Sequence, residues 1–268
     1  MSTHAIHADP AVGSGATLRG IRDVATLTGR SLRHVLRSPD TIVTTAVMPI
    51  AFLLLFTFVL GGAIDVGDAA YVDYLLPGIL LITIASGIAY TSYRLFLDLQ
   101  AGIVERLQAM PIARSAVLWA HVLTSLVANL VSLAVVVLAA LAMGFRSGAG
   151  IGAWLAVAGI LVLVTLALTW VAIIAGLTAR SVDGASAFSY PLILLPFVSS
   201  AFVPTETMPG PVRWFAEHQP VTAIVDAMRA LLAGEPVGGE LAVALAWVLG
   251  ILVVAATIAA AIQRRRRA

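Results

Sequence analysis

Long apolar runs, separated by short polar connectors, make up most of the chain after residue 40. Each run is close to the roughly 20 residues that a helix needs to cross the hydrocarbon core of a bilayer. The pattern predicts an all-α membrane protein whose six transmembrane helices lie at about 41–60, 74–93, 117–143, 151–177, 184–203 and 241–262. Residues 38–268 would then form one six-span transmembrane domain, with prolines that kink its first and fifth helices.

The segment before the first run is polar and rich in arginine, and it contains no apolar core of signal-peptide length. We expect residues 1–17 to form a flexible tail and residues 18–37 to form an amphipathic helix at the cytoplasmic interface. On a helical projection the arginines of this helix share one face, which suits anionic headgroups: Arg19, Arg22, Arg30, Arg33 and Arg37. A basic stretch that serves topology alone is the alternative.

The connector at 204–239 is long for a loop, and four prolines punctuate it. Apolar residues recur at helical spacing after Pro220, and Asp226 with Arg229 can form an ion pair at i, i+3. The pattern predicts two short helices in an outer helical segment, with Trp214 and Phe215 as anchors in the outer leaflet. A plain surface helix on the outer face is the alternative.

The distribution of arginine sets the expected orientation, because short cytoplasmic flanks of membrane proteins carry an excess of positive charge. With the N-terminus inside, only Arg146, Arg213 and Arg229 face outward. All other arginines are then cytoplasmic: Arg19, Arg22, Arg30, Arg33, Arg37, Arg94, Arg106, Arg114, Arg180 and Arg264 to Arg267. The even number of predicted spans agrees with this arrangement, since both termini are rich in arginine.

Composition narrows the class of protein further. The 268 residues are 60% hydrophobic and only 11% charged, whereas about a quarter of the residues of a soluble domain are charged. There is no cysteine, and the five histidines are too scattered to predict a metal site. There is also no lysine, which a phosphate-binding P-loop requires. We therefore expect no ATPase activity, no metal and no cofactor in this chain, so that energy for transport would come from a partner.

The predicted spans contain no Asp, Glu or Arg, which argues against an ion-coupled carrier and against an enzyme with acids inside the membrane. Neutral polar residues do occur there, and Ser125, Asn129 and Ser132 share one face of the third span. Hydrogen bonding between helices is the expected role of such residues. Contact with a passing substrate is the alternative, and it gives a set of candidates for a translocation path: Ser125, Asn129, Ser189, Tyr190 and Ser199.

The loop at 94–116, between the second and third spans, carries the stretch DLQAGIVERLQAMPIARS. Its apolar residues, among them Ile103 and Leu107, form one stripe on a short helix, and Glu105 faces away from it. Pro111 would end this helix. An apolar edge with a charged rim suits a groove on a partner protein. A helix that lies on the membrane surface would show the same pattern.

Three of these features together resemble the type-two ABC exporter permeases, in particular the daunorubicin-resistance branch of actinobacteria. They are the arginine-rich helix before the first span, the segment GIVERLQAMPIARS, and the outer segment bounded by prolines. The outer segment resembles the family pattern of an Asn-Pro or Gln-Pro step followed by a helix with Asp and Arg. The matching positions are Gln219, Pro220, Asp226 and Arg229, with glutamine where many relatives carry asparagine.

The resemblance implies a half-transporter in the bacterial plasma membrane. It would pair with a second permease, identical or related, and with two cytoplasmic ABC ATPase subunits that hold ATP and magnesium. The loop after the second span would be the coupling helix that docks on the ATPase, through Ile103, Val104, Glu105, Arg106, Leu107, Met110, Pro111 and Arg114. The expected function is export of hydrophobic or amphiphilic compounds such as drugs or lipids. A membrane scaffold or lipid-binding component is the alternative from another class.

Overall fold

The computed structural model describes residues 28–29, 39–62, 70–103 and 116–265. Of residues 39–45 and 116 it describes the backbone alone. Every regular element in these parts of the chain is a helix. The predicted tail at 1–17 lies outside the described residues. So does the predicted interfacial helix at 18–37, apart from its helical residues 28 and 29.

Within the described residues, four helices are long and apolar enough to cross a membrane. They are α3 (Tyr71–Gln100), α5 (Ala116–Ala142), α6 (Ile151–Thr178) and α11 (Glu240–Arg265). The first predicted span is a shorter apolar unit, in which α2 (Pro39–Leu54) continues into one π-helical stretch, η1 (Leu55–Leu60). These helices agree with a multi-pass membrane protein.

The predicted fifth span is a shorter apolar helical unit, Val182–Val198. It consists of α7 (Val182–Ala187), α8 (Ser189–Leu194) and the 3₁₀ turn η2 (Leu195–Val198), with helical backbone angles at the junction residue Phe188, and the chain becomes extended at Ser199. Pro191 has no N–H to donate to the carbonyl of Ala187, where α7 ends. Pro196 likewise has no N–H to donate to the carbonyl of Leu192, and it is the second residue of the tighter turn. The prolines therefore break the run of helical hydrogen bonds in this segment, the broken fifth segment, although its backbone stays helical as far as Val198.

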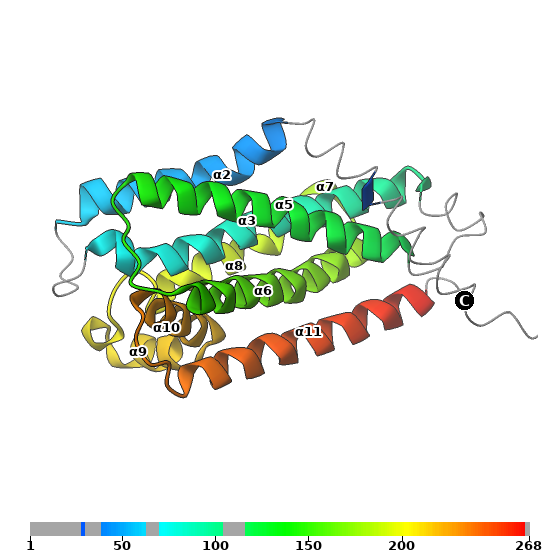
Figure 1. Ribbon diagram of the computed structural model, residues 1–268. Coiled ribbons are helices and arrows are strands. Elements are labelled where there is room, and N and C mark those ends of the chain that lie inside the picture. Colours follow the sequence, from blue (N-terminus) through cyan, green and yellow to red (C-terminus); the bar gives the residue numbers. More distant parts are fainter. Residues whose placement is uncertain (1–27, 30–38, 63–69, 104–115, 266–268) are drawn as a thin grey trace, which may run out of the picture.

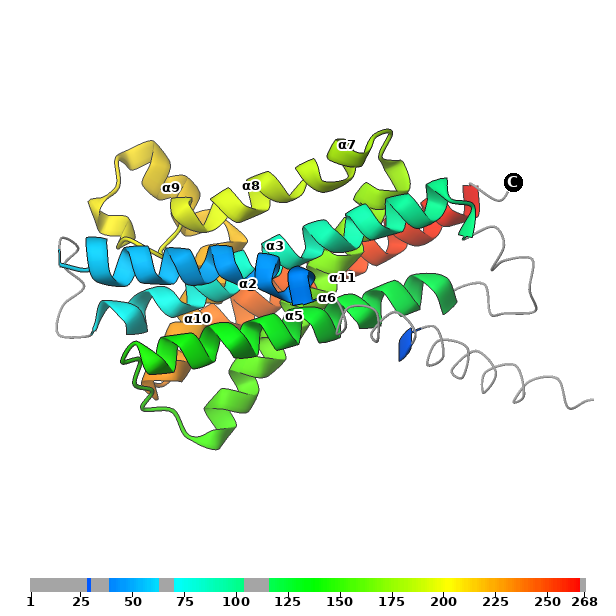
Figure 2. The same cartoon turned by 90° about the horizontal axis from the view of Figure 1, so that it is seen from above.

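The long helices lie side by side, and α3 is at the centre of the bundle (Figures 1 and 2). It packs against α2, α5, α6, α7 and α8, whereas α11 packs on α6 and α10 along one edge. In the most apolar stretch of each helix, 72% of the residues of α3 are buried and only 17% of those of α11. Helix α3 therefore forms the core, and most of the apolar surface of α11 is left uncovered by the rest of the described chain.

Two buried clusters hold the bundle together. The larger cluster gathers side chains such as Leu75, Ile79 and Met228 from α3, α6 and the outer segment. The smaller cluster lies nearer the other end of α3 and includes Leu95 and Trp170. This second cluster joins α3, α5, α6 and α11 near the loop that follows α3.

Candidate functional site

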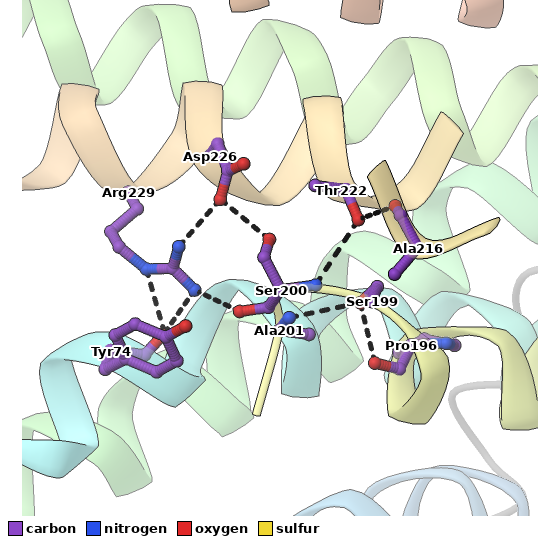
Figure 3. Close-up of polar contacts among 9 residues, drawn as sticks. All are labelled: Tyr74, Pro196, Ser199, Ser200, Ala201, Ala216, Thr222, Asp226 and Arg229. Atoms are coloured by element: carbon purple, nitrogen blue, oxygen red, sulfur yellow. Dashed lines mark hydrogen bonds and ion pairs between the residues drawn. The ribbon is translucent and has the colours of Figure 1, made fainter. Parts of the chain in front are cut away.

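The outer segment carries a polar network that joins three parts of the chain (Figure 3). It contains α9 (Gly210–His218) and α10 (Pro220–Ala233), and the predicted ion pair forms between Arg229 Nη1 and Asp226 Oδ1 at 2.7 Å. Ser200 Oγ donates to the same carboxylate oxygen at 2.7 Å, and Arg229 Nη2 donates to the Ser200 carbonyl at 2.8 Å. The guanidinium carbon lies 3.7 Å from the centre of the Tyr74 ring. Arg229 thus connects α10 to α3 and to the end of the broken fifth segment.

Arg229 also provides a hydrogen-bond donor where helical hydrogen bonding ends after that segment. The Ser200 carbonyl lies in a turn after η2, beyond the last helical residue, so it has no place in a helical hydrogen-bond ladder. A carbonyl in an apolar protein region needs a donor, because leaving it without one costs about 1–3 kcal/mol. Arg229 provides that donor, and weaker contacts of 3.3 and 3.4 Å reach the Tyr74 carbonyl in the first turn of α3.

The Gln219-Pro220 step begins α10 and contacts the same broken segment. Gln219 Oε1 accepts a hydrogen bond from the backbone N–H of Val221, and Gln219 Nε2 donates to the Val198 carbonyl at 3.1 Å. Pro220 occupies the first turn of α10, where a missing N–H has no cost. The four outer-motif residues therefore act together: Gln219 and Pro220 start the helix, and Asp226 and Arg229 hold its side to the bundle.

A pocket of about 510 Å³ opens beside this network. Its lining carries charges of both signs, from Asp73, Arg146, Asp226, Arg229 and Glu235. The Arg146 backbone N–H donates to Asp73 Oδ1 at 3.1 Å, and its guanidinium donates to the Phe145 carbonyl at 2.9 Å. The end of the bundle next to Arg229 is therefore polar and open.

A second polar cluster lies inside the bundle. Thr91 of α3 donates to Ser125 Oγ of α5 at 2.8 Å, and the Ser125 hydroxyl lies 3.1 Å from that of Thr169 in α6. All three residues are buried. The hydrogen bonding between helices that the sequence predicts for Ser125 is thus present, and it joins the three central helices.

Asn129 lies one turn further along α5 and packs directly on α3. Its Nδ2 donates to the Ser125 carbonyl at 2.9 Å, but its buried Oδ1 has no conventional hydrogen-bond partner. A Cβ placed on Gly87 would overlap this oxygen. The Cα–H of Gly87 therefore faces Oδ1, a weak donor of the kind that recurs where membrane helices approach closely.

Gly87→Ala is expected to destabilise the bundle by about 1–3 kcal/mol, because the new methyl group would meet the buried Asn129 amide. Gly159 of α6 is the matched control, since open space surrounds the position of its Cβ. Gly159→Ala should be neutral or stabilising by up to about 1 kcal/mol, as alanine favours helix. Thermal unfolding in detergent measures both changes, and equal stability of the two variants would contradict this packing.

The remaining path candidates, Ser189, Tyr190 and Ser199, come from the broken fifth segment. Ser189 is buried and donates to the Ser186 carbonyl at 2.8 Å, and buried Ser199 donates to the Pro196 carbonyl at 2.6 Å. Tyr190 has 65% of its surface exposed. Of these three, Tyr190 alone presents its side chain to the surroundings.

The loop between α3 and α5 starts where α3 ends at Gln100. Gly102 follows with φ of 64°, a left-handed conformation that glycine adopts without strain and that turns the chain out of the helix. Ile103 is the last described residue before the loop. The other predicted coupling residues lie outside the described residues: Val104, Glu105, Arg106, Leu107, Met110, Pro111 and Arg114.

The two helices that flank this loop are joined near its base. His121 Nε2 of α5 lies 3.4 Å from Asp98 Oδ2 of α3, and both side chains are largely buried. The sequence does not name Asp98 as the partner of His121. It likewise gives no role to Tyr74, and no local signal links Tyr74 to Arg229, because 155 residues separate them.

Within the described residues no three His, Cys, Asp or Glu side chains are grouped so as to hold a metal ion. The structure there is a bundle of apolar helices with polar networks inside it and at one end. It is the fold of a helical multi-pass membrane protein.

Residues 22–233 match the family model described as ABC-2 type transporter, and this range covers most of the chain. The chain therefore belongs to the ABC-2 type transporter family. It is 27% identical over 259 residues to the daunorubicin resistance ABC transporter permease protein DrrB1 of Streptomyces coeruleorubidus, covering 91% of this chain and 89% of that protein. It is 29% identical over 233 residues to the probable doxorubicin resistance ABC transporter permease protein DrrC of Mycobacterium tuberculosis, covering 85% and 83%. Both relatives are permease proteins by name.

Proposed function

We propose that this chain is the membrane subunit of an ABC exporter, with six spans and both termini in the cytoplasm. A separate cytoplasmic ATPase, which holds ATP and magnesium, drives it. The cargo is a hydrophobic or amphiphilic compound. The names of two relatives, which refer to daunorubicin and doxorubicin resistance, support an amphiphilic drug as the first cargo to test.

The observation that carries this proposal is the extent of the family match. It begins before the first apolar run and continues through α10, so it includes both the loop after α3 and the outer motif. The described ends of that loop lie at the end of the bundle where α11 also ends (Figure 1). Arginines at this end of the bundle, such as Arg264 and Arg265, support a cytoplasmic placement of the loop.

In this proposal the loop at 94–116 forms the coupling helix, whose stripe of Ile103, Val104, Leu107 and Met110 docks on the ATPase. The pair of His121 and Asp98 holds the two flanking helices at the base of the loop. A displacement of the docked loop would then move α3 and α5 together. Since α3 is the central helix, such a movement would reach the whole bundle.

The proposed path for cargo uses the broken segment and a second permease, either a further copy or a relative. The short helices of this segment expose Tyr190 and Leu194, with 65% and 61% of their surfaces accessible. Phe58 of η1 is 69% exposed. Exposed aromatic and aliphatic side chains along both segments suit an amphiphile that enters laterally or from the inner leaflet.

Copurification tests the class of protein. A tagged chain expressed with its neighbouring genes should bring down a soluble ATPase that carries a P-loop, and reconstituted vesicles should accumulate daunorubicin when ATP is outside. A scaffold protein would bring down no such ATPase and would not move the drug. That result would end the exporter proposal, whereas an ATPase partner without daunorubicin transport would redirect the search to other amphiphiles.

A further inference from the structure

Helices α6 and α11 lie along one edge of the bundle (Figure 1). An apolar groove lies between them. Its volume is about 670 Å³, within the range of roughly 300–1,000 Å³ for sites that hold small ligands. Val171 and Ile174 of α6 form one wall, and Trp247, Val254 and Ile258 are on the side of α11. Every lining residue is an apolar side chain or a glycine. An occupant of this groove must therefore present hydrocarbon to it.

The groove is longer than one leaflet of a bilayer. Its lining on α11 runs from Val243 to Ile258, 15 residues that correspond to about 22 Å along a helix. The hydrocarbon core of a bilayer is about 30 Å thick, so one leaflet contributes about half of that. An acyl chain of one leaflet that lies along α11 would therefore fill the part of the groove nearer Ile258.

Two positive charges stand at one end of the groove. Arg265 follows Ile258 by seven residues, close to two full helical turns, so it continues the face of α11 that lines the groove. Arg264 precedes it, and both side chains are exposed in the last turn of α11. The helix is about 39 Å long at 1.5 Å per residue, which exceeds the hydrocarbon core and places this turn in the headgroup region.

The geometry points to a binding site for an anionic phospholipid, whose acyl chain occupies the α6–α11 groove and whose phosphate contacts Arg264 and Arg265. Arg265 continues the helix face that lines the groove, and Arg264 lies about 100° from it in the same turn. A neutral hydrocarbon would not require these charges. In the orientation of the proposed function this lipid lies in the cytoplasmic leaflet, and the site depends on the proposed function in this respect alone. Lipid binding to the permease alone is independent of any ATPase or cargo.

Native mass spectrometry of the full chain in detergent tests the site, with dioleoylphosphatidylglycerol and dioleoylphosphatidylcholine as probes. The anionic lipid should bind the wild type at least about fivefold more tightly, since one arginine near a membrane surface contributes about that factor. The double variant Arg264→Gln, Arg265→Gln should bind the two lipids equally. It retains the groove, so binding of the zwitterionic lipid should stay at the wild-type level.

Gly250→Leu tests the groove itself. Gly250 lines it, and open space surrounds the position of its Cβ, so the leucine side chain enters the groove without a clash in the protein. Affinity for both lipids should fall, whereas the control Gly159→Leu, at another open glycine, should bind both like the wild type. Equal affinity of the wild type for the two lipids would overturn the charge assignment. Unchanged lipid binding in Gly250→Leu would overturn the site. If that variant instead disrupted a dimer of the chain, the groove would be a contact surface between two copies of the protein.

Discussion

A chain that carries Leu107→Pro is expected to insert and fold like the wild type but to lose ATP-driven export. Leu107 is central in the apolar stripe of the proposed coupling helix. Proline in a helix interior costs about 3 kcal/mol, which lowers the population of the helix roughly a hundredfold. Without that helix the ATPase would hydrolyse ATP while cargo stays in place. Drug accumulation and ATPase rate, measured in the same reconstituted vesicles, report the two activities separately.

A charge reversal gives an independent test of the same surface, with a matched control. Glu105→Arg changes the rim of the proposed docking helix, and Glu206→Arg makes the same change at an exposed residue of the outer segment. Export should fall for Glu105→Arg and stay at the wild-type level for Glu206→Arg. If Leu107→Pro and Glu105→Arg both exported normally, the coupling role of this loop would have to be abandoned.

Arg229→Gln is expected to lower the stability of the protein by about 2 kcal/mol, or roughly 4–8 °C in melting temperature. Glutamine can replace at most part of the hydrogen bonding, and it leaves the Asp226 carboxylate without its ion pair. Because that carboxylate has only 34% of its side chain exposed, water compensates incompletely. The contact between α10 and the broken segment should loosen first, which thermal unfolding and protease cleavage near Ser200 would reveal.

Arg213→Gln is the matched control for that variant. Arg213 also pairs with an acid on its own helix, at 2.7 Å to Glu217, and this hydrogen bond raises the pKa of the guanidinium. The Arg213 side chain is 45% exposed, against 23% for Arg229. Exposed pairs contribute little to stability, so Arg213→Gln should change the melting temperature by no more than about 2 °C. Similar losses in the two variants would show that Arg229 does not connect separate parts of the chain.

The apolar runs alone were sufficient to predict a helical membrane protein. Their length and hydropathy specify the four long helices, because the energy of crossing a bilayer depends on composition over about 20 residues and not on distant contacts. The ion pair of Asp226 and Arg229 was predictable for a similar reason, since a spacing of three residues places both side chains on one helix face. The functional assignment to the coupling loop also comes from sequence, and its residues 104–115 lie outside the described part of the structure.

The tertiary structure decided which residues those local features meet. Sequence indicated that prolines disturb the fifth segment, but only packing shows that Arg229 supports the resulting break through Ser200 and Tyr74. It also showed that Asn129 rests on Gly87, where no local pattern marks the glycine as special. These contacts join residues that are 29 to 155 positions apart, and local periodicity determines which way a side chain faces but not which distant helix it meets. The long helices follow from composition, and the polar networks that hold them in register follow from the fold.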